Sequence, residues 1–363
     1  GTMSETAEAA LAAPPRLPLP IPWRAWSRGL FGSPLNTAIT VACLLLLGWA
    51  VPPLVRWAVT DATWVGTADT CRRNGGACWA FIGEKLRFIL FGFYPADLQW
   101  RPALVLVLLL GLVAASGVPR LWHRRMVAVW VLAVAGSVSL LLGKPGGTPG
   151  TTDAWGGLPL TLLLAVVGMG AAFPLAVLLA LGRRSRMAVV RLFSVLFIEV
   201  LRGVPLIAVL YVASLVVPLM LPAGADIDKL LRAQIAIVLF TAAYLAEIVR
   251  AGLQAVPPGQ HEAALSLGFG YWGTMRLVIL PQALRTVIPS IVTLAIGILH
   301  DTTLVIVIGL FDVLNTARSS ASDPHWIGYF DEAFAFAAVL YLVLCALASR
   351  YSLWLEARLA RPR

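Results

Sequence analysis

The chain has 363 residues, of which 59% are hydrophobic and only 13% are charged, and its formal net charge is +10. A soluble domain would carry about a quarter charged residues, so this composition excludes an ordinary soluble protein and indicates a polytopic helical membrane protein. The basic residues are spread over several short loops, with no patch long enough to follow a phosphate backbone. We therefore expect no nucleic-acid partner and a lipid membrane as the surroundings.

The first 35 residues are expected to form a cytoplasmic tail that ends in an interfacial helix. Gly1 and Thr2 precede Met3 and resemble a cloning remnant. The Pro-rich run over residues 3–22 cannot form a helix, whereas Trp23 and Trp26 suit a short helix at the membrane surface. Because no apolar core comes before the run that begins near residue 35, we expect no cleavable signal peptide.

Long apolar runs predict about eight transmembrane helices, since each span needs about 20 apolar residues. The basic residues of the N-terminus, of the connections after the second, fourth and sixth spans, and of the C-terminus fall on one side. The positive-inside rule therefore predicts that both termini are cytoplasmic. The external loop 56–102 also contains basic residues, but loops of this length are weaker guides to orientation. The spans are expected near residues 36–55, 103–119, 126–143, 158–181, 194–221, 233–255, 283–309 and 333–353.

Four cysteines divide into two kinds of position. Cys43 and Cys345 lie within spans and are expected to be packing residues. Cys71 and Cys78 lie in the external loop, with Gly75 and Gly76 between them to allow a tight turn. A disulfide is chemically permitted in an oxidising periplasm, and two free thiols remain the alternative. Residues 79–94 could then form a short interfacial helix.

The sequence gives no sign of internal chemistry. It has no G-x-x-x-x-G-K-[ST] motif, so it is not expected to bind ATP through a P-loop. His261 and Glu262 could begin the zinc motif H-E-x-x-H, but position 265 is Leu. No metal site, no cofactor and no enzymatic activity are therefore expected on this chain.

Residues 257–268 read as a separate short helix between the sixth and seventh spans. Pro258 suits a first helical turn, and Gly268 suits the left-handed residue that ends a helix. Small Ala263 and Ala264, with apolar Leu265, could lie in the groove of another protein; the alternative is a helix that only joins two spans. A second short helix is expected over Thr274–Leu280, closed by Pro281. The expected docking residues are Gln260, His261, Glu262, Ala263, Ala264, Leu265 and Gly268.

Several motifs together resemble a known family. They are "EVLRGVPLIAVL" at 199–210, "AAYLAEIVRAGLQAVPPGQHEAALSLG" at 242–268 and "LHDTTLVIVIGL" at 299–310. Residues 158–355 resemble ABC importer permeases of the polar amino acid (His/Met/Gln-type) family, although Val278 replaces the Ile of the family's I-x-L-P motif. The "GGACWAFI" segment and its surroundings resemble the larger membrane subunit of the general L-amino acid importers.

The resemblance implies an all-α polytopic membrane protein with a five-helix type I ABC importer core. Residues 36–157 would be a three-span N-terminal extension that contains the periplasmic loop 56–102. Residues 158–355 would be the permease core with the coupling helix 257–268, and residues 356–363 a cytoplasmic C-terminus. The expected location is the bacterial inner membrane.

The implied function is that of the permease subunit of an ATP-driven importer for L-amino acids of a broad polar range, such as Glu, Asp, Gln and Asn. The implied partners are a second homologous permease subunit in a heterodimer, two ATPase subunits that hold ATP and Mg, and a periplasmic amino-acid-binding protein. The alternative is an ion-coupled secondary carrier, which would predict an inverted repeat that the two halves do not show.

Polar residues inside the spans are the candidates for the substrate pathway, because charges there usually face a cavity or a partner. Asp301 is expected to meet the substrate ammonium, since it lies in the segment that resembles the family's K-D-T-S. Glu199 and Arg202 have i,i+3 spacing, as have Glu247 and Arg250, so each pair could instead be structural. Gly203 and Pro205 could loosen the fifth span for gating or only kink it. The full set of candidates is Asp301, His300, Thr302, Thr303, Glu199, Arg202 and Tyr244.

Overall fold

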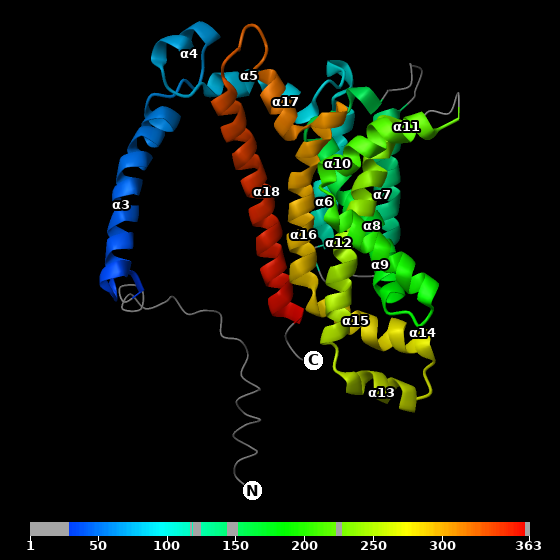
Figure 1. Ribbon diagram of the computed structural model, residues 1–363. Helices are drawn as coiled ribbons and strands as arrows, with labels where there is room; N and C mark the ends of the chain where they lie inside the picture. The colour runs from blue at the N-terminus through cyan, green and yellow to red at the C-terminus, as the bar shows by residue number, and fades with distance from the viewer. Residues whose placement is uncertain (1–28, 117, 119–124, 144–151, 223–226, 360–363) are drawn as a thin grey trace. The chain divides into compact units, whose positions relative to one another are not determined.

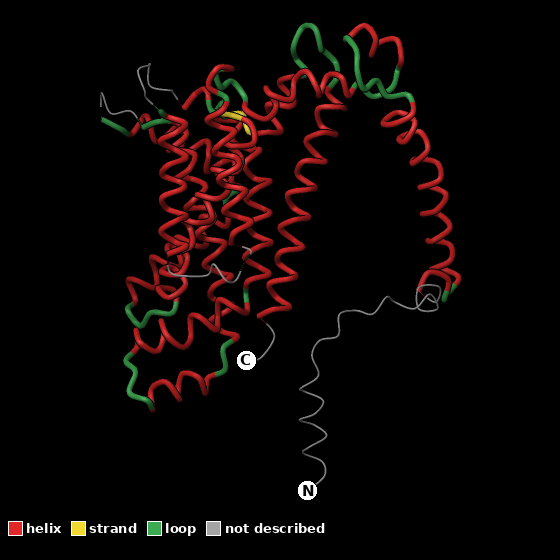
Figure 2. Tube along the Cα trace, turned by 180° about the vertical axis from the view of Figure 1, so that it is seen from behind, coloured by secondary structure: helices red, strands yellow, loops and turns green. Residues whose placement is uncertain are grey.

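The computed structural model describes residues 29–116, 118, 125–143, 152–222 and 227–359 (Figures 1 and 2). The chain divides into two compact units, one made of residues 1–81 and 360–363 and the other of residues 82–359. The expected N-terminal tail and its interfacial helix lie outside the described residues. Each unit is described by itself.

The first unit consists of one apolar helix and a small cap at its end. Helix α3 (Pro34–Val55) begins at Ser33, whose side chain accepts a hydrogen bond from the backbone N–H of Asn36. The π-helical turn η1 (Arg56–Thr60) continues it, so the apolar helix runs to Thr60, five residues beyond the predicted end. Most of its side chains are apolar and none is buried, as expected of a helix in lipid.

The cap is helix α4 (Ala68–Asn74), and a disulfide holds it closed. Cys71 and Cys78 are bonded, with 5.5 Å between their Cα atoms. Gly76 makes the turn possible, because a Cβ at this position would lie 2.1 Å from the carbonyl oxygen of Asp61. The indole N–H of Trp79 donates to the carbonyl of Ala58, which ties the start of the next helix to η1.

The second unit begins with the helices that precede the resembling core. Helix α5 (Trp79–Phe91) occupies most of the expected interfacial segment and is followed by the short η2 (Ala96–Leu98), α6 (Trp100–Ser116) and α7 (Arg125–Leu142). The hydroxyl of Tyr94 donates to the carbonyl of Leu141, at 3.1 Å. The hydroxyl of Thr316 donates to the carbonyl of Ile89, at 2.7 Å. The first bond joins the segment after α5 to α7, and the second joins α5 to helix α17 (Val313–Ser320).

The core of the second unit contains the remaining predicted spans. They are η4 (Thr152–Ala154) and α8 (Gly157–Arg183), α9 (Ala188–Gly203), α10 (Leu206–Tyr211) with η5 (Val212–Val216) and α11 (Val217–Met220), α12 (Lys229–Ala255), α16 (Ile288–Asp301) with η7 (Thr302–Ile308), and α18 (Phe330–Leu359).

Eight apolar segments correspond to the eight predicted spans, but only six of them are long, continuous helices. Among the described residues, six helices are long and apolar enough to cross a membrane, and a bent pair of helices makes a seventh span if it counts as one. The eighth is α6, which has 17 residues and is shorter than a typical span.

The fifth span is broken rather than merely kinked. Helix α9 ends at Gly203, Val204 is extended, and Pro205 caps α10. The two halves meet at an angle of 104°. Pro205 has no N–H to continue the helix of α9, and it restricts Val204 to extended backbone, which explains the break at this point.

The connection from α12 to α16 corrects one prediction. Helix α13 (Pro258–Ser266) is followed by α14 (Tyr271–Gly273), the π-helical η6 (Thr274–Ile279) and α15 (Leu280–Thr286). Pro281 was expected to close the second short helix, but it lies in the first turn of α15, where its missing N–H costs nothing. The break before the seventh span comes at Val287, so residues 283–287 are not part of α16.

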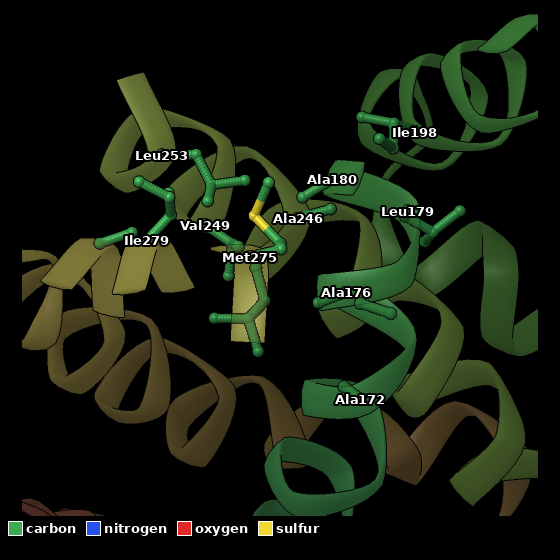
Figure 3. Packing of buried hydrophobic residues seen from close by; sticks show 13 residues of the cluster. Ala172, Ala176, Leu179, Ala180, Ile198, Ala246, Val249, Leu253, Met275 and Ile279 are labelled. Atoms are coloured by element: carbon green, nitrogen blue, oxygen red, sulfur yellow. The ribbon is translucent and has the colours of Figure 1, made fainter. Parts of the chain in front are cut away.

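Near the other end of the unit, β1 (Phe311–Asp312) and α17 (Val313–Ser320) connect η7 to α18. Figure 1 shows α17 and α13 at opposite ends of the core helices. A cluster of small and apolar side chains lies towards the α13 end (Figure 3). Ala176 and Ala180 of α8, Ala246 of α12 and Met275 of η6 belong to it, so the connection that carries α13 is packed against two long helices.

Candidate functional site

A cluster of charged side chains joins α8, α9 and α12 near the end that leads to α13. Glu247 of α12 lies at its centre and its side chain is 16% exposed. Its carboxylate is 2.7 Å from a guanidinium nitrogen of Arg183 and 2.9 Å from one of Arg250, and Arg202 lies at 4.0 Å. Three arginines around one carboxylate leave an excess of positive charge that another anion can neutralise.

The structure changes one of the predicted pairs and confirms the other. Glu199 does not pair with Arg202; its partner in the described part of the chain is Arg183, at 2.9 Å, on the neighbouring helix. Glu247 and Arg250 do pair, as their i,i+3 spacing predicted. Arg183 is one of the basic residues in the predicted connection after the fourth span, and nothing in the sequence links it to residues on α9 or α12.

A cavity of about 280 Å³ opens beside this cluster. Arg202, Tyr244 and Glu247 supply its polar wall, and Ser290 of α16 adds a hydroxyl. The guanidinium of Arg202 lies over the ring of Tyr244, 5.5 Å from its centroid. This cation–π contact stabilises the position of the guanidinium. A guanidinium in the wall of a cavity can bind the carboxylate of an amino acid, whereas the carboxylate of Glu247 is already neutralised by Arg183 and Arg250.

The other predicted pathway residues lie farther along α16. His300 is six residues beyond Leu294, a wall residue of the cavity, which is about 9 Å by helical rise. His300 is exposed, its Nε2 is 3.4 Å from Cys345 Sγ, and its ring is 5.6 Å from that of Tyr341. Asp301 follows it and is half-buried. The predicted candidates thus form two groups rather than one.

Thr302 and Thr303 have structural contacts. Thr302 is fully buried and its hydroxyl donates to the carbonyl of Leu299, so a substrate cannot reach it in this conformation. The carbonyl of Thr303 accepts a hydrogen bond from Asn315 at 3.0 Å. Asp312, which was not predicted, is fully buried beside them and accepts from the Tyr341 hydroxyl at 3.0 Å.

Helix α13 has the ends that the sequence predicted. Pro258 lies in the first turn and Gly268 is left-handed, with φ of 79°. The N–H of Phe269 donates to the carbonyl of Ala264, and the N–H of Gly268 donates to that of Leu265. This pair of bonds is a Schellman motif, which satisfies carbonyls that the helix end leaves free.

Nearly the whole surface of α13 is free in the described structure. Gln260, His261 and Glu262 are exposed, and Leu265 and Leu267 are 52% and 78% exposed. Tyr271 and Trp272 continue this apolar exposure beyond the helix. Exposed apolar side chains on a short helix at the end of a membrane protein mark a contact surface for another protein.

Ala264 does not belong to that surface. It is 2% exposed and is the one buried residue of α13, because α13 packs on η6 through this side. The amide of Gln282 also donates to Gln260 Oε1, at 3.1 Å. Through η6, α13 is linked to Met275 and Ile279, which lie in the cluster with Ala246 and Val249 of α12 (Figure 3). Helix α13 is therefore connected through η6 to α12, which carries Glu247.

Comparison with known proteins gives one family for the whole arrangement. Residues 172–361 match the family of binding-protein-dependent transport system inner membrane components. The chain is 46% identical over 341 residues to the inner membrane amino-acid ABC transporter permease protein YhdY of Escherichia coli (strain K12), with 92% of each chain covered. It is 37% identical over 405 residues to the glutamate/glutamine/aspartate/asparagine transport system permease protein BztC of Rhodobacter capsulatus, with 93% of each covered.

A solved structure has a similar fold. The crystal structure of an amino acid ABC transporter with histidines contains a chain that superposes with a TM-score of 0.50 at 32% sequence identity. The match covers 55% of this chain and 91% of the other. The alignments with the two curated relatives, in contrast, cover 92% and 93% of this chain, so they include residues that precede the family match at 172–361.

Proposed function

The chain belongs to the family of binding-protein-dependent transport system inner membrane components, the permease subunits of ABC importers, and on that premise we propose that it carries polar L-amino acids, Glu, Asp, Gln and Asn among them. A permease of this kind is an inner-membrane subunit and not itself an enzyme; ATP hydrolysis occurs on separate ATPase subunits. The substrate range is supported by the name of BztC, which aligns over 93% of both chains.

The observation that carries the proposal is the placement of α13. An exposed helix with a fixed end is packed through Ala264 on η6, and η6 is packed on α12. Gln260, His261, Glu262, Leu265 and Gly268 would contact a groove of the ATPase, with Glu262 near an Arg or Lys of that subunit. Closure of two ATPases that hold ATP and Mg would then move α13 and, through it, the core helices.

The pathway is proposed to pass the charged cavity. Arg202 would hold the carboxylate of the amino acid, with Tyr244 beside it. Asp301 and His300 would form a second polar group that lines the pathway farther along α16. The 104° break after Gly203 places Arg202 at the free end of α9, where a tilt of α9 against α10 can open or close the cavity.

The assembly is proposed to contain a second, homologous permease subunit in a heterodimer and a periplasmic amino-acid-binding protein that delivers the substrate. The positive-inside rule supports cytoplasmic termini and a cytoplasmic α13. The Cys71–Cys78 disulfide supports an oxidising exterior on the side of α4. These two arguments are independent and agree on the orientation.

Reconstitution tests the proposal. The chain, its second permease subunit, the ATPase and the binding protein are inserted in proteoliposomes, and uptake of labelled glutamate is measured with and without ATP. We expect uptake only with ATP and the ATPase, and inhibition by excess Gln, Asp or Asn. Uptake by the chain alone, or driven by an ion gradient without ATP, would show that it is a secondary carrier.

A further inference from the structure

A second cavity lies between α7, α8 and α12, at the opposite end of α12 from the charged cluster. Its volume is about 620 Å³, within the range of about 300–1,000 Å³ that is usual for small-molecule sites. Val138 of α7, Leu163 of α8 and Leu231 of α12 form its apolar walls. Leu231 and Glu247 are 16 residues apart, about 24 Å by helical rise, so this cavity is separate from the proposed pathway.

The rim of the cavity is charged. Asp153 and Asp228 both line it, and the ammonium of Lys229 lies 2.7 Å from the carboxylate of Asp153. Asp228 also caps α12 by accepting from the N–H groups of Leu230 and Leu231. Two carboxylates and one ammonium leave one negative charge at the mouth of an apolar cavity, which is complementary to a ligand with a cationic head and an apolar body.

Trp155 adds a free donor. Its side chain lines the cavity and is 4% exposed, and its Nε1–H has no acceptor among the residues that the structure describes. A buried donor without an acceptor destabilises the folded protein, so an oxygen atom on a ligand at this position would be favourable.

The ligand can enter from the bilayer. Several side chains of α7 that do not line the cavity are exposed and apolar, Val127, Val131 and Leu132 among them, as in a helix in contact with lipid. A wall formed by α7 therefore separates the cavity from hydrocarbon and not from water. A soluble metabolite has no apolar body to fill such a space, whereas a lipid acyl chain has.

We propose that this cavity binds a phospholipid with a primary ammonium headgroup, of the phosphatidylethanolamine class. One acyl chain lies between α7, α8 and α12, and the ammonium donates hydrogen bonds to Asp153 and Asp228. An ester or phosphate oxygen accepts from Trp155 Nε1–H. A choline headgroup has no N–H to donate to the carboxylates, and an anionic glycerol headgroup would be repelled by them.

The experiment measures lipids retained by the whole transporter. The complex of this chain with its partner subunits is equilibrated in nanodiscs with equal amounts of phosphatidylethanolamine, phosphatidylcholine and phosphatidylglycerol. It is then extracted, washed, and its bound lipids are quantified by mass spectrometry. We expect phosphatidylethanolamine to be enriched about tenfold over phosphatidylcholine, which corresponds to about 1.4 kcal/mol, the scale of one charge-assisted hydrogen bond.

Two variants locate the site. Val138→Trp fills the cavity and is expected to abolish the enrichment, whereas Val131→Trp, on the exposed face of the same helix, is expected to keep it. Asp153→Asn is expected to reduce the enrichment severalfold, and Asp97→Asn, an exposed aspartate away from the cavity, should not. Val138→Phe serves as a smaller filling variant if Val138→Trp does not fold.

Three results would overturn the proposal. They are equal retention of phosphatidylethanolamine and phosphatidylcholine, a preference for phosphatidylglycerol, and unchanged enrichment in a folded filling variant. The test is independent of the transported substrate, because lipid retention is measured without transport. Loss of amino acid uptake in the wild-type complex would therefore contradict the proposed function without affecting the lipid site.

Discussion

Arg183 at the end of α8 donates a hydrogen bond to Glu247 in the middle of the charged cluster, at 2.7 Å. The two residues are 64 positions apart in the chain, and the contact joins two long core helices, α8 and α12, near the end that leads to α13. The same guanidinium reaches Glu199 on α9. Arg183 therefore holds α8, α9 and α12 together beside the cavity proposed for the substrate pathway.

Replacing Glu247 with Gln should destabilise the protein and impair transport. The substitution removes the only carboxylate within 4.0 Å of Arg202 and Arg250 among the described residues, and it leaves three guanidinium groups close together. We expect a loss of about 2 kcal/mol, less than the about 3–5 kcal/mol for a fully buried pair, because the cluster is partly exposed. Thermal unfolding of the purified complex measures this.

Glu199→Gln is the matched control. Its side chain is 52% exposed and it contacts one arginine, so the loss should stay within about 1 kcal/mol. If both variants lose the same stability, Glu247 is not the centre of the cluster.

Arg202→Lys should separate a binding role from a packing role. Lysine keeps the positive charge but not the planar donor set that a substrate carboxylate needs. We expect the substrate concentration at half-maximal uptake to rise about tenfold, corresponding to about 1.4 kcal/mol, with little change in unfolding temperature. Arg250→Lys, which pairs with Glu247 and Gln254 but does not line the cavity, is the control and should leave this concentration unchanged. An equal effect of both variants would contradict the assignment of Arg202.

Gly268 should be required for coupling because of its backbone and not because of space. Its φ is 79° and nothing lies within 4 Å of a Cβ added to it. Alanine would cost about 1–2 kcal/mol in this left-handed conformation, which shifts the end of α13. We expect Gly268→Ala to reduce uptake while ATP hydrolysis continues. The ratio of amino acid transported to ATP hydrolysed is the measurement.

Gly259→Ala is the control for this experiment, because Gly259 lies inside α13 without a positive φ and also has open space around it. Alanine favours helix there, so transport per ATP should stay at the wild-type value. A fall of equal size in both variants would point to a contact surface that tolerates no added methyl group, rather than to the turn at Gly268.

Much of the fold follows from the sequence because the bilayer requires long apolar helices with internally satisfied backbones. Each of the eight predicted spans contains a helix that begins within about six residues of the expected start, since a change from polar to apolar residues is easy to locate. The ends of α13 were also predictable, because Pro258 and Gly268 act through local backbone geometry. The seventh span begins five residues later than expected, because the helix breaks at Val287 and starts again with Pro289 in its first turn.

The contacts of the site were less predictable than its helices. The i,i+3 rule found Glu247 with Arg250 because both lie on one helix, but it gave Glu199 the wrong partner, since Arg183 comes from another helix. Ala264 looked like part of a docking face, yet it faces η6. Both errors concern which side of a helix meets a distant segment, which is decided by packing between elements far apart in the chain.

The disulfide should be visible by thiol counting. The chain has four cysteines, of which Cys71 and Cys78 are bonded and Cys43 and Cys345 are free. Denatured, unreduced protein should therefore take up two maleimide groups, and reduced protein four. Four groups without reduction would show that the bond does not form in the cell. In the Cys71→Ser/Cys78→Ser variant, the cap should lose about 2–3 kcal/mol, measured by its sensitivity to protease.

Asp323 should make the stability of the segment between α17 and α18 depend on acid pH. A hydrogen bond and charge from Lys85, with their atoms 2.8 Å apart, hold the pKa of Asp323 below its usual value of 3.8. Because the folded pKa is lower than the unfolded one, the unfolded state binds more protons between them. The contribution is therefore present above about pH 4 and is lost as the pH falls through the folded pKa.

The midpoint of thermal unfolding should fall more between pH 5 and pH 3 in the wild type than in Asp323→Asn. Asp69→Asn is the control, because the side chain of Asp69 is 74% exposed and its replacement should retain the wild-type pH dependence. Identical unfolding curves for Asp323→Asn and the wild type would show that the Lys85 contact does not stabilise the folded state.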